Sequence, residues 1–450
     1  MKRNFLFKTV IAVITASLAL SFASCAKADG KDTGNADKYE IEFSQKEYVV
    51  VLNDDNSSKI GAEARENGNK INNAELTYTV ANPAIAEIAE DGAIISKAEG
   101  ETAVTASYKG VNASATLKVV ASATADQVNS FDEEYVNLYG RTYKRGKSQL
   151  CLDHVCTGLD IAINGTYLNA SIVSTSEQYI CIFVDGKPES IRMQVSPMET
   201  NYELVSGLER GYHTVKIAKS SESGDGQIRI GSFESEGFAK IPDNTGLKIE
   251  FIGDSITSGY GALGIGGART VANSDACSSY AYYAASALNA NYSMIALQGI
   301  CVKALYYRQE NMIDLYKIIS SQNSNEYAFG WNPDVVVVSL GTNDSGYIRS
   351  KNSEYAAQFS DDYLELLQYV REKNPNAYIL CIYSIMGKTF EVDDGISTAI
   401  QAMKDDKIIR VDDYVKFTVN GSGANGHPSY TAQKENGQKL AEYIKTLLAL

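Results

Sequence analysis

Positive charge, histidine and tryptophan are scarce in this chain of 450 residues. It carries 41 lysines and arginines against 55 aspartates and glutamates, which gives a formal net charge of −14. Nucleic-acid binding needs basic stripes that neutralise phosphates, and the sequence has none, so nucleic acid is excluded as a partner. The excess of acidic residues otherwise serves mainly to keep the protein soluble.

Metal-ligand spacing is also absent. The seven cysteines and three histidines form no CxxC pair and no Cys/His cluster, so we expect no structural zinc and no cofactor. So few cysteines in so long a chain do not make a disulfide scaffold. Cys151 and Cys156 are near enough in sequence to pair across a turn, and free buried thiols are the alternative.

The N-terminus predicts export. Basic residues precede an apolar run, Val10–Phe22, that is too short to span a membrane, and small residues then lead into Cys25. This arrangement resembles a bacterial lipoprotein signal, although Phe22 replaces the usual leucine; an ordinary secretory signal is the alternative. The resemblance implies a signal peptide over residues 1–25 and a lipid on Cys25 that anchors the protein to a bacterial membrane. A polar, flexible tether over residues 26–38 is expected to follow.

The length suggests about three domains, of which the first two read as β-structure. Residues 39–121 hold short alternating runs separated by Asn-Pro, Asp-Gly and Lys-Gly turns, a pattern typical of an antiparallel sandwich. The stretch LTYTVANPAIAEIAEDGAIISKAEGETAVTASYKG resembles a bacterial immunoglobulin-like group 2 domain. It contains no cluster of titratable residues. We therefore interpret it as a spacer in preference to an adhesion module.

Residues 126–242 continue with strand-like segments and no helical periodicity, which predicts a second β-sandwich of the jelly-roll type. His154 and His213 lie here, and we expect both to be structural. The segments Gly140-Arg141-Thr142, Asn164-Gly165-Thr166, Val184-Asp185-Gly186 and GLERGYHTVKIAKSSE resemble the N-terminal domain of carbohydrate esterase family 2. That resemblance implies a β-domain packed against a catalytic domain.

From about residue 246 to 450 the pattern changes to apolar strands alternating with helix-length stretches. Such alternation predicts a parallel sheet covered on both faces, a three-layer α/β domain. The predicted strands are Lys248–Ile252, Tyr292–Leu297, Asp334–Leu340, Tyr378–Ile385 and Lys407–Asp412. The predicted helices are Ser278–Leu288, Lys303–Ser320, Glu354–Lys373, Ile396–Lys404 and Thr431–Leu448.

Ligands of open parallel sheets bind at the carboxyl ends of the strands, and polar residues gather there in this sequence. Ser255 follows the first predicted strand, Gly299 the second and Asn343 the third, and His427 precedes the last helix. A nucleophile, a base and N–H donors for an oxyanion are what acyl transfer from an ester requires. Taken alone, the turn at Ser255 could equally be a helix cap.

The blocks GDSITSGYG, Gly299, GTND and His427-Pro428 resemble those of the SGNH, or GDSL-like, hydrolase superfamily. With the preceding β-domain, about 320 residues resemble carbohydrate esterase family 2. The resemblance implies Ser255 as nucleophile, His427 as base, and an oxyanion hole from the N–H groups of Ser255 and Gly299 and the side chain of Asn343. Position 257 is threonine, which disfavours the GxSxG elbow of α/β-hydrolases.

One departure concerns the acid that most SGNH enzymes carry three residues before the histidine. Here that position is Ala424. Members of family 2 are known to work with a Ser–His pair whose ring is oriented by a backbone carbonyl, so we predict a dyad. An acid from elsewhere, with Asp412 or Asp413 nearest upstream, and an inactive enzyme are the alternatives.

The family resemblance implies removal of acetyl groups from plant polysaccharides of the xylan and mannan types. Tyr260 and the loop GALGIGGAR are placed to shape one wall of the cleft, and Asp344 is a further candidate for substrate contact. Trp331 would either stack on a sugar or pack at the start of a strand. The alternative functions are an esterase or lipase acting on another ester, and a non-catalytic surface protein that binds carbohydrate.

Overall fold

The computed structural model describes residues 38–52, 58–121, 127–198, 200–242, 245–351, 354–383, 385–411 and 422–450. The predicted signal peptide, Cys25, Asp412 and Asp413 lie outside these ranges. No helix in the described ranges is both long enough and apolar enough to cross a membrane.

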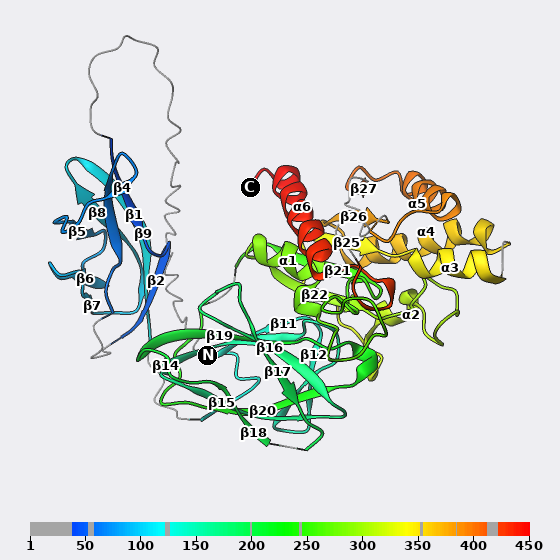
Figure 1. Cartoon of the computed structure of the whole chain (residues 1–450), viewed down its shortest axis with the longest axis horizontal. Helices are drawn as coiled ribbons and strands as arrows, with labels where there is room; N and C mark the ends of the chain where they lie inside the picture. The colour runs from blue at the N-terminus through cyan, green and yellow to red at the C-terminus, as the bar shows by residue number, and fades with distance from the viewer. Residues whose placement is uncertain are drawn as a thin grey trace, which may run out of the picture.

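The first β-domain lies at one end of the molecule (Figure 1). Its strands are β1 (Tyr39–Phe43), β2 (Glu47–Val51), β3 (Ala62–Glu66), β4 (Asn69–Lys70), β5 (Thr77–Val80), β6 (Ala86–Ile88), β7 (Ile94–Ser96), β8 (Gly100–Tyr108) and β9 (Val111–Val120). Alternate residues of β8 and β9, such as Val104 and Leu117, are buried between the sheets. The expectation of a purely antiparallel sandwich is wrong in one detail, because β2 pairs with β9 in parallel.

The second β-domain is a sandwich of two antiparallel sheets. Its strands are β10 (Gln127–Asn129), β11 (Val136–Tyr139), β12 (Thr142–Arg145), β13 (Gln149–Leu152), β14 (Gly158–Gly165), β15 (Leu168–Ser174), β16 (Gln178–Val184), β17 (Ile191–Val195), β18 (Thr200–Val205), β19 (Gly211–Lys219) and β20 (Ile228–Glu234). One sheet runs β12-β13-β20-β15-β18 with β10 beside β20, and the other runs β11-β14-β19-β16-β17. Apolar side chains of both inner faces interlock to form the core.

The third domain contains a five-stranded parallel sheet in the order β22-β21-β25-β26-β27. Its strands are β21 (Lys248–Gly253), β22 (Asn291–Ala296), β25 (Val335–Ser339), β26 (Tyr378–Ile382) and β27 (Ile408–Val411). The predicted parallel sheet is therefore confirmed. Valine and isoleucine fill the central strands because both faces of this sheet are covered.

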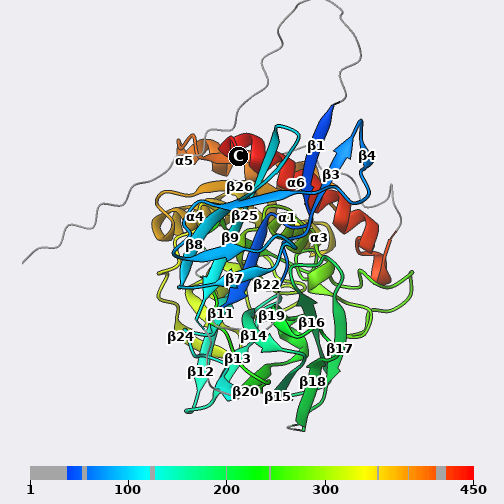
Figure 2. The same cartoon turned by 90° about the vertical axis from the view of Figure 1, so that its left-hand side faces the viewer.

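Helices cover the two faces, and alternate strand residues point to each. The helices are α1 (Tyr280–Ala287), α2 (Met312–Lys317), α3 (Thr342–Lys351), α4 (Tyr355–Lys373), α5 (Phe390–Met403) and α6 (Tyr430–Leu448). Phe251 and Val337 pack with α1 and α6, whereas Ile252 and Val338 pack with α2, α4 and α5. Figure 2 shows α6 crossing above the sheet from a second side.

Two predicted helices need correction, and a third helix was missed. The predicted helix Ile396–Lys404 begins earlier, because α5 starts at Phe390. The expected helix Lys303–Ser320 is confined to α2, and Ile318–Ser320 instead forms β23, which pairs with β24 (Asn323–Glu326). The carbonyls of Tyr316 and Ile318 accept hydrogen bonds from Arg141 of the sandwich (2.7 and 2.8 Å). These bonds help to end α2 and to hold the following residues in an extended conformation. Helix α3 was not predicted, since its sequence has no apolar stripe.

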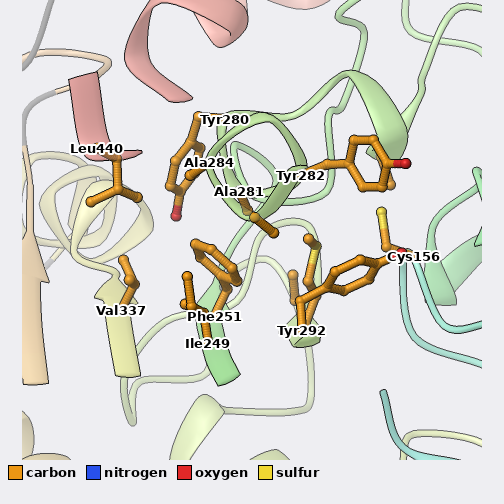
Figure 3. Packing of buried hydrophobic residues seen from close by; sticks show 14 of the residues in the cluster. Cys156, Ile249, Phe251, Tyr280, Ala281, Tyr282, Ala284, Tyr292, Val337 and Leu440 are labelled. Atoms are coloured by element: carbon orange, nitrogen blue, oxygen red, sulfur yellow. The ribbon is translucent and has the colours of Figure 1, made fainter. Parts of the chain in front are cut away.

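The sandwich and the third domain share one apolar core. Tyr139 stacks on Tyr292 with ring centroids 5.1 Å apart, and Phe183 stacks on Tyr282 at 5.3 Å. Figure 3 shows Tyr282 and Tyr292 close to Cys156 of the sandwich, beside the packing of α1 on β21. These contacts hold the two domains together, since aromatic burial of this kind dominates interface energetics.

Candidate active site

Ser255 and His427 meet at the carboxyl edge of the parallel sheet. Nε2 of His427 lies 2.8 Å from Oγ of Ser255, although 172 positions separate the two residues. Ser255 lies two residues after the end of β21, and His427 follows a short 3₁₀ turn before α6. The distance is that of a hydrogen bond between a nucleophile and its base.

The turn after β21 is fixed by its own polar groups. Oδ1 of Asp254 accepts the N–H of Ile256 (2.9 Å), and the carbonyl of Ser255 accepts the N–H of Tyr260 (3.1 Å). Glycine is needed at position 253 because a Cβ there would lie 2.0 Å from Oγ1 of Thr257. The close return of the chain holds the Ser255 side chain at the cavity, where it is 6% exposed.

The imidazole of His427 is oriented by a backbone carbonyl. Its Nδ1 lies 3.2 Å from the carbonyl oxygen of Asn425, a residue in the left-handed conformation (φ 51°). The tautomer that donates from Nδ1 leaves Nε2 free to accept the Ser255 proton. Among the described residues no carboxylate hydrogen-bonds the ring, and Ala424, three residues before His427, is buried.

Tyr260 covers the imidazole. The two ring centroids are 4.3 Å apart, and Nδ2 of Asn425 donates to the Tyr260 hydroxyl (3.4 Å). Burial lowers the pKa of His427 below its ordinary value, against the opposing effect of the Asn425 carbonyl. The histidine is therefore neutral, and able to act as a base, at neutral pH.

Three candidate N–H donors belong to residues that line the cavity. Among the described residues, the backbone N–H groups of Ser255 and Gly299 have no acceptor, and both residues line the cavity. The side chain of Asn343 donates to the carbonyl of Ile300 (2.9 Å), which fixes the amide. Its other proton makes only a long contact with Asp254 (3.4 Å), so it remains available to a substrate oxygen.

Two candidate substrate contacts, Asp344 and Trp331, do not line the cavity. Asp344 is fully buried, where its carboxylate accepts the N–H of Val302 (3.2 Å) and the hydroxyl of Tyr355 (3.3 Å), and burial raises its pKa to about 7. Trp331 accepts a hydrogen bond from Lys248 at the opposite edge of the sheet (3.3 Å) and does not line the cavity. Asp344 therefore supports the backbone at Val302, and Trp331 lies in the segment that leads into β25.

The cavity has a volume of about 430 Å³ and opens to solvent. Its lining consists of Ser255, Tyr260, Gln298, Gly299, Tyr307, Arg308, Thr342, Asn343, Gly346, Arg349, Met386, Asn425 and His427. Arg308, Arg349 and Tyr307 were not predicted as cavity residues. Tyr307 and Arg308 fall in the segment that was wrongly predicted as helix, and Arg349 lies on α3, which was not predicted. The role of Asn425 in orienting the imidazole was also missed, and its place two residues before His427 was the one sequence feature that indicated it.

Metal-type donors gather at one place in the described part of the chain, away from the cavity. Cys181, Asp275 and Cys277 bring their donor atoms within 4.8 Å of one another, and Sγ of Cys156 lies 3.9 Å from that of Cys277. Asp275 already accepts from Ser220 (2.8 Å) and from other groups of its own turn, and burial keeps the thiol pKa values high. The cluster therefore reads as packing, and the described cysteines, Cys151 included, are free.

The remaining histidines are structural. His154 is buried with Nε2 3.1 Å from the carbonyl of Ile319, and burial lowers its pKa to about 3. His213 pairs with Asp185 (2.8 Å), and the hydrogen bonds it makes raise its pKa. Neither residue lines the cavity.

Ser255 of the GDS block and His427 pair at the carboxyl edge of a parallel sheet, and Asn343 of the GTND block lines the same cavity. This arrangement defines an SGNH-type hydrolase. Residues 251–447 match the GDSL-like lipase/acylhydrolase family, and residues 138–243 match the N-terminal domain of carbohydrate esterase 2. Residues 138–447 therefore belong to carbohydrate esterase family 2, a family of carboxylic ester hydrolases.

Known relatives agree with this assignment. The chain is 29% identical over 307 residues to a cellulase/esterase of Acetivibrio thermocellus. The match covers 65% of this chain and 37% of that protein. It is 24% identical over 269 residues to an acetylxylan esterase/glucomannan deacetylase of Cellvibrio japonicus, covering 56% of this chain and 73% of the relative. The chain thus spans about a third of the first relative's length.

A solved structure shows the same two-domain arrangement. A family two carbohydrate esterase from Clostridium thermocellum, determined in complex with cellohexaose, superposes with a TM-score of 0.65 at 26% identity. The match covers 70% of this chain and 99% of that one. The first β-domain lies outside the two family matches.

Proposed function

We propose that the protein is a carbohydrate O-acetylesterase that removes acetyl groups from plant-type polysaccharides or oligosaccharides. The observation that carries the proposal is the 2.8 Å contact between Ser255 and His427 in a cavity that also holds unengaged N–H donors. A relative named acetylxylan esterase/glucomannan deacetylase supports the xylan and mannan classes of substrate.

In the first half-reaction, Oγ of Ser255 attacks the acetyl carbonyl carbon while Nε2 of His427 takes the hydroxyl proton. The Asn425 carbonyl holds the Nδ1–H and so keeps the ring in the required tautomer. Negative charge on the carbonyl oxygen is stabilised by the N–H groups of Ser255 and Gly299 and by the Asn343 amide. Collapse expels the sugar oxygen, which receives the proton from His427.

In the second half-reaction, a water molecule gives its proton to Nε2 of His427 and attacks the acetyl-serine. The same three donors stabilise the second oxyanion. Its collapse returns the proton to Ser255 and releases acetate. A Ser–His dyad suffices for this cycle, since the base is neutral at neutral pH and its orientation is supplied by the backbone.

Acetate release from acetylated xylan, acetylated glucomannan and short acetylated oligosaccharides tests the proposal, with Ser255→Ala as the control. We expect release from at least one substrate and its loss in Ser255→Ala. A series of p-nitrophenyl esters of increasing chain length separates the alternatives. Preference for long chains would favour a lipase, and failure of a fluorophosphonate probe to label Ser255 would favour a non-catalytic binding protein.

We also propose export and a lipid anchor on Cys25, on the strength of the N-terminal pattern. The first β-domain would then be an immunoglobulin-like spacer that holds the enzyme away from the membrane, and the second a jelly roll. Cell fractionation of the natural chain and of Cys25→Ala tests the anchor. The natural chain is expected in the membrane fraction, and the variant outside it.

A further inference from the structure

The active-site cavity carries positive charge in a chain whose net charge is −14. Arg308 and Arg349 are the charged side chains among its lining residues, and no carboxylate of the described residues lines it. The two arginines come from different elements, the segment before α2 and the helix α3. Their convergence on one cavity is therefore a product of the fold.

Both arginines line the cavity that holds Ser255 and His427. A Cβ placed on Gly299 would lie 3.6 Å from Cγ of Arg308, so the side chain of Arg308 starts beside a proposed oxyanion donor. Arg349 is on α3, the helix that also carries Asn343, and its Nε donates to the carbonyl of Ser345 (3.3 Å). The exposed ring of Tyr307 belongs to the same lining.

The charges are only partly compensated. Nε of Arg308 pairs with Glu310 (3.0 Å), and the same residue has two further nitrogens with no acceptor among the described residues. Arg349 forms no ion pair with any residue in the described ranges. The carboxyls of Glu222, Asp254 and Asp344 lie near the cavity, but all three are buried and none lines it.

We propose that Arg308 and Arg349 form a subsite for the carboxylate of a hexuronic acid, so that the enzyme acts on acetylated acidic saccharides. The planar guanidinium presents paired N–H donors that match a carboxylate, and such charge-assisted bonds are about twice as strong as neutral ones. Neutral sugars offer only hydroxyls to these cations. This assignment rests on the proposed esterase function and specifies its substrate class.

The test compares two chemically acetylated trisaccharides, trigalacturonic acid and its carboxyl-reduced neutral counterpart, brought to the same degree of acetylation. We expect kcat/KM to be at least about tenfold higher for the acidic one at low ionic strength. The preference should shrink in about 1 M salt, where the Debye length falls to about 3 Å. Equal kcat/KM values for the two trisaccharides would overturn the subsite.

Variants identify the residues. Arg349→Gln and Arg308→Gln are each expected to lower the acidic-to-neutral ratio of kcat/KM several-fold. The control Lys303→Gln removes a cation of the same segment that pairs with Glu365 outside the cavity (2.6 Å), and it should leave the ratio unchanged. A loss that is equal for both trisaccharides would contradict the assignment.

The two proposals fail in different ways. If the neutral trisaccharide is deacetylated and the acidic one is not preferred, the esterase stands and the hexuronate subsite falls. If neither trisaccharide nor any acetylated polysaccharide releases acetate, the esterase function itself is overturned.

Discussion

Glu222, a residue of the β-sandwich, accepts the backbone N–H of Gln298 at the end of a catalytic-domain strand. The same carboxyl oxygen accepts the hydroxyl of Ser258, three residues after the nucleophile (3.1 Å). One buried side chain thus joins the turn that carries Ser255 to the turn that carries Gly299. The sandwich therefore positions two parts of the active site.

Glu222→Ala should lower kcat with little change in KM, because the donor of Gly299 would lose its support. A displacement of about 1 Å in a reacting group can cost about 100-fold in rate, and we expect a loss between about 10- and 100-fold. Steady-state kinetics with p-nitrophenyl acetate measures it. Glu222→Gln retains an acceptor oxygen and should restore most of kcat, whereas equal losses in both variants would argue against positioning.

Asn343→Ala should reduce kcat by about 100- to 1,000-fold, the cost of removing one oxyanion donor. The effect falls on kcat because the donor strengthens its bond only as charge develops on the carbonyl oxygen. Kinetics on an acetylated oligosaccharide checks the size. Asp344→Asn, which alters the adjacent buried support, serves as the comparison and should mainly lower thermal stability.

The pH profile of kcat/KM distinguishes a dyad from a triad. Burial disfavours the charged imidazolium, so the pKa of His427 lies below 6.5 and the neutral, active base persists down to that lower pH. Activity should therefore fall only below pH 6.5. A carboxylate partner would raise this pKa, so an acid limb well above 6.5 would contradict the dyad. Tyr260→Ala exposes the ring and should shift the limb upward.

The conformation of Asn425 should control the orientation of the base. A β-branched residue is strained at a φ of 51°, at a cost of about 1–3 kcal/mol. Asn425→Val is expected to turn the carbonyl away from Nδ1 and to lower kcat. Asn425→Gly accommodates the same φ and is the matched control, with activity near that of the natural enzyme. Equal activity of the two variants would show that this carbonyl is not needed.

Arg141 should be essential for docking of the sandwich on the catalytic domain. It is fully buried, donates to two carbonyls of the neighbouring domain and lies 3.7 Å from the buried carboxylate of Glu250. Removing one partner of a buried pair costs about 3–5 kcal/mol, so Arg141→Ala should strongly lower the free energy of unfolding.

Urea denaturation measures that change. Arg210→Ala breaks an exposed pair with Glu236 (3.0 Å), and the Arg210 side chain is 56% exposed. Such pairs contribute about 1 kcal/mol or less, so this variant is the control. Similar losses in the two variants would contradict the proposed role of Arg141 in docking.

Much of the catalytic domain could be predicted from the chain. Near-continuous valine and isoleucine in Asp334–Leu340 indicated a buried parallel strand, and β25 lies within that range. Because parallel strands end at a common edge, the motif residues after them had to be neighbours. That is why Ser255, Gly299 and Asn343 were expected to lie together, whereas their roles and that of His427 were implied by the resemblance to the SGNH blocks. The cavity brings all four together.

Other features were decided only by tertiary contacts. Nothing local marks Glu222 or Arg141 as parts of the catalytic domain's support, because their partners lie far away in sequence. Arg308 and Arg349 share a cavity only because one segment is not helical and another is. The motif acid Asp344 looked available, yet the packing of Tyr355 and Val302 buries it. Local patterns set the strands and their polar ends, whereas burial and long-range hydrogen bonds determined which of those polar groups face the substrate.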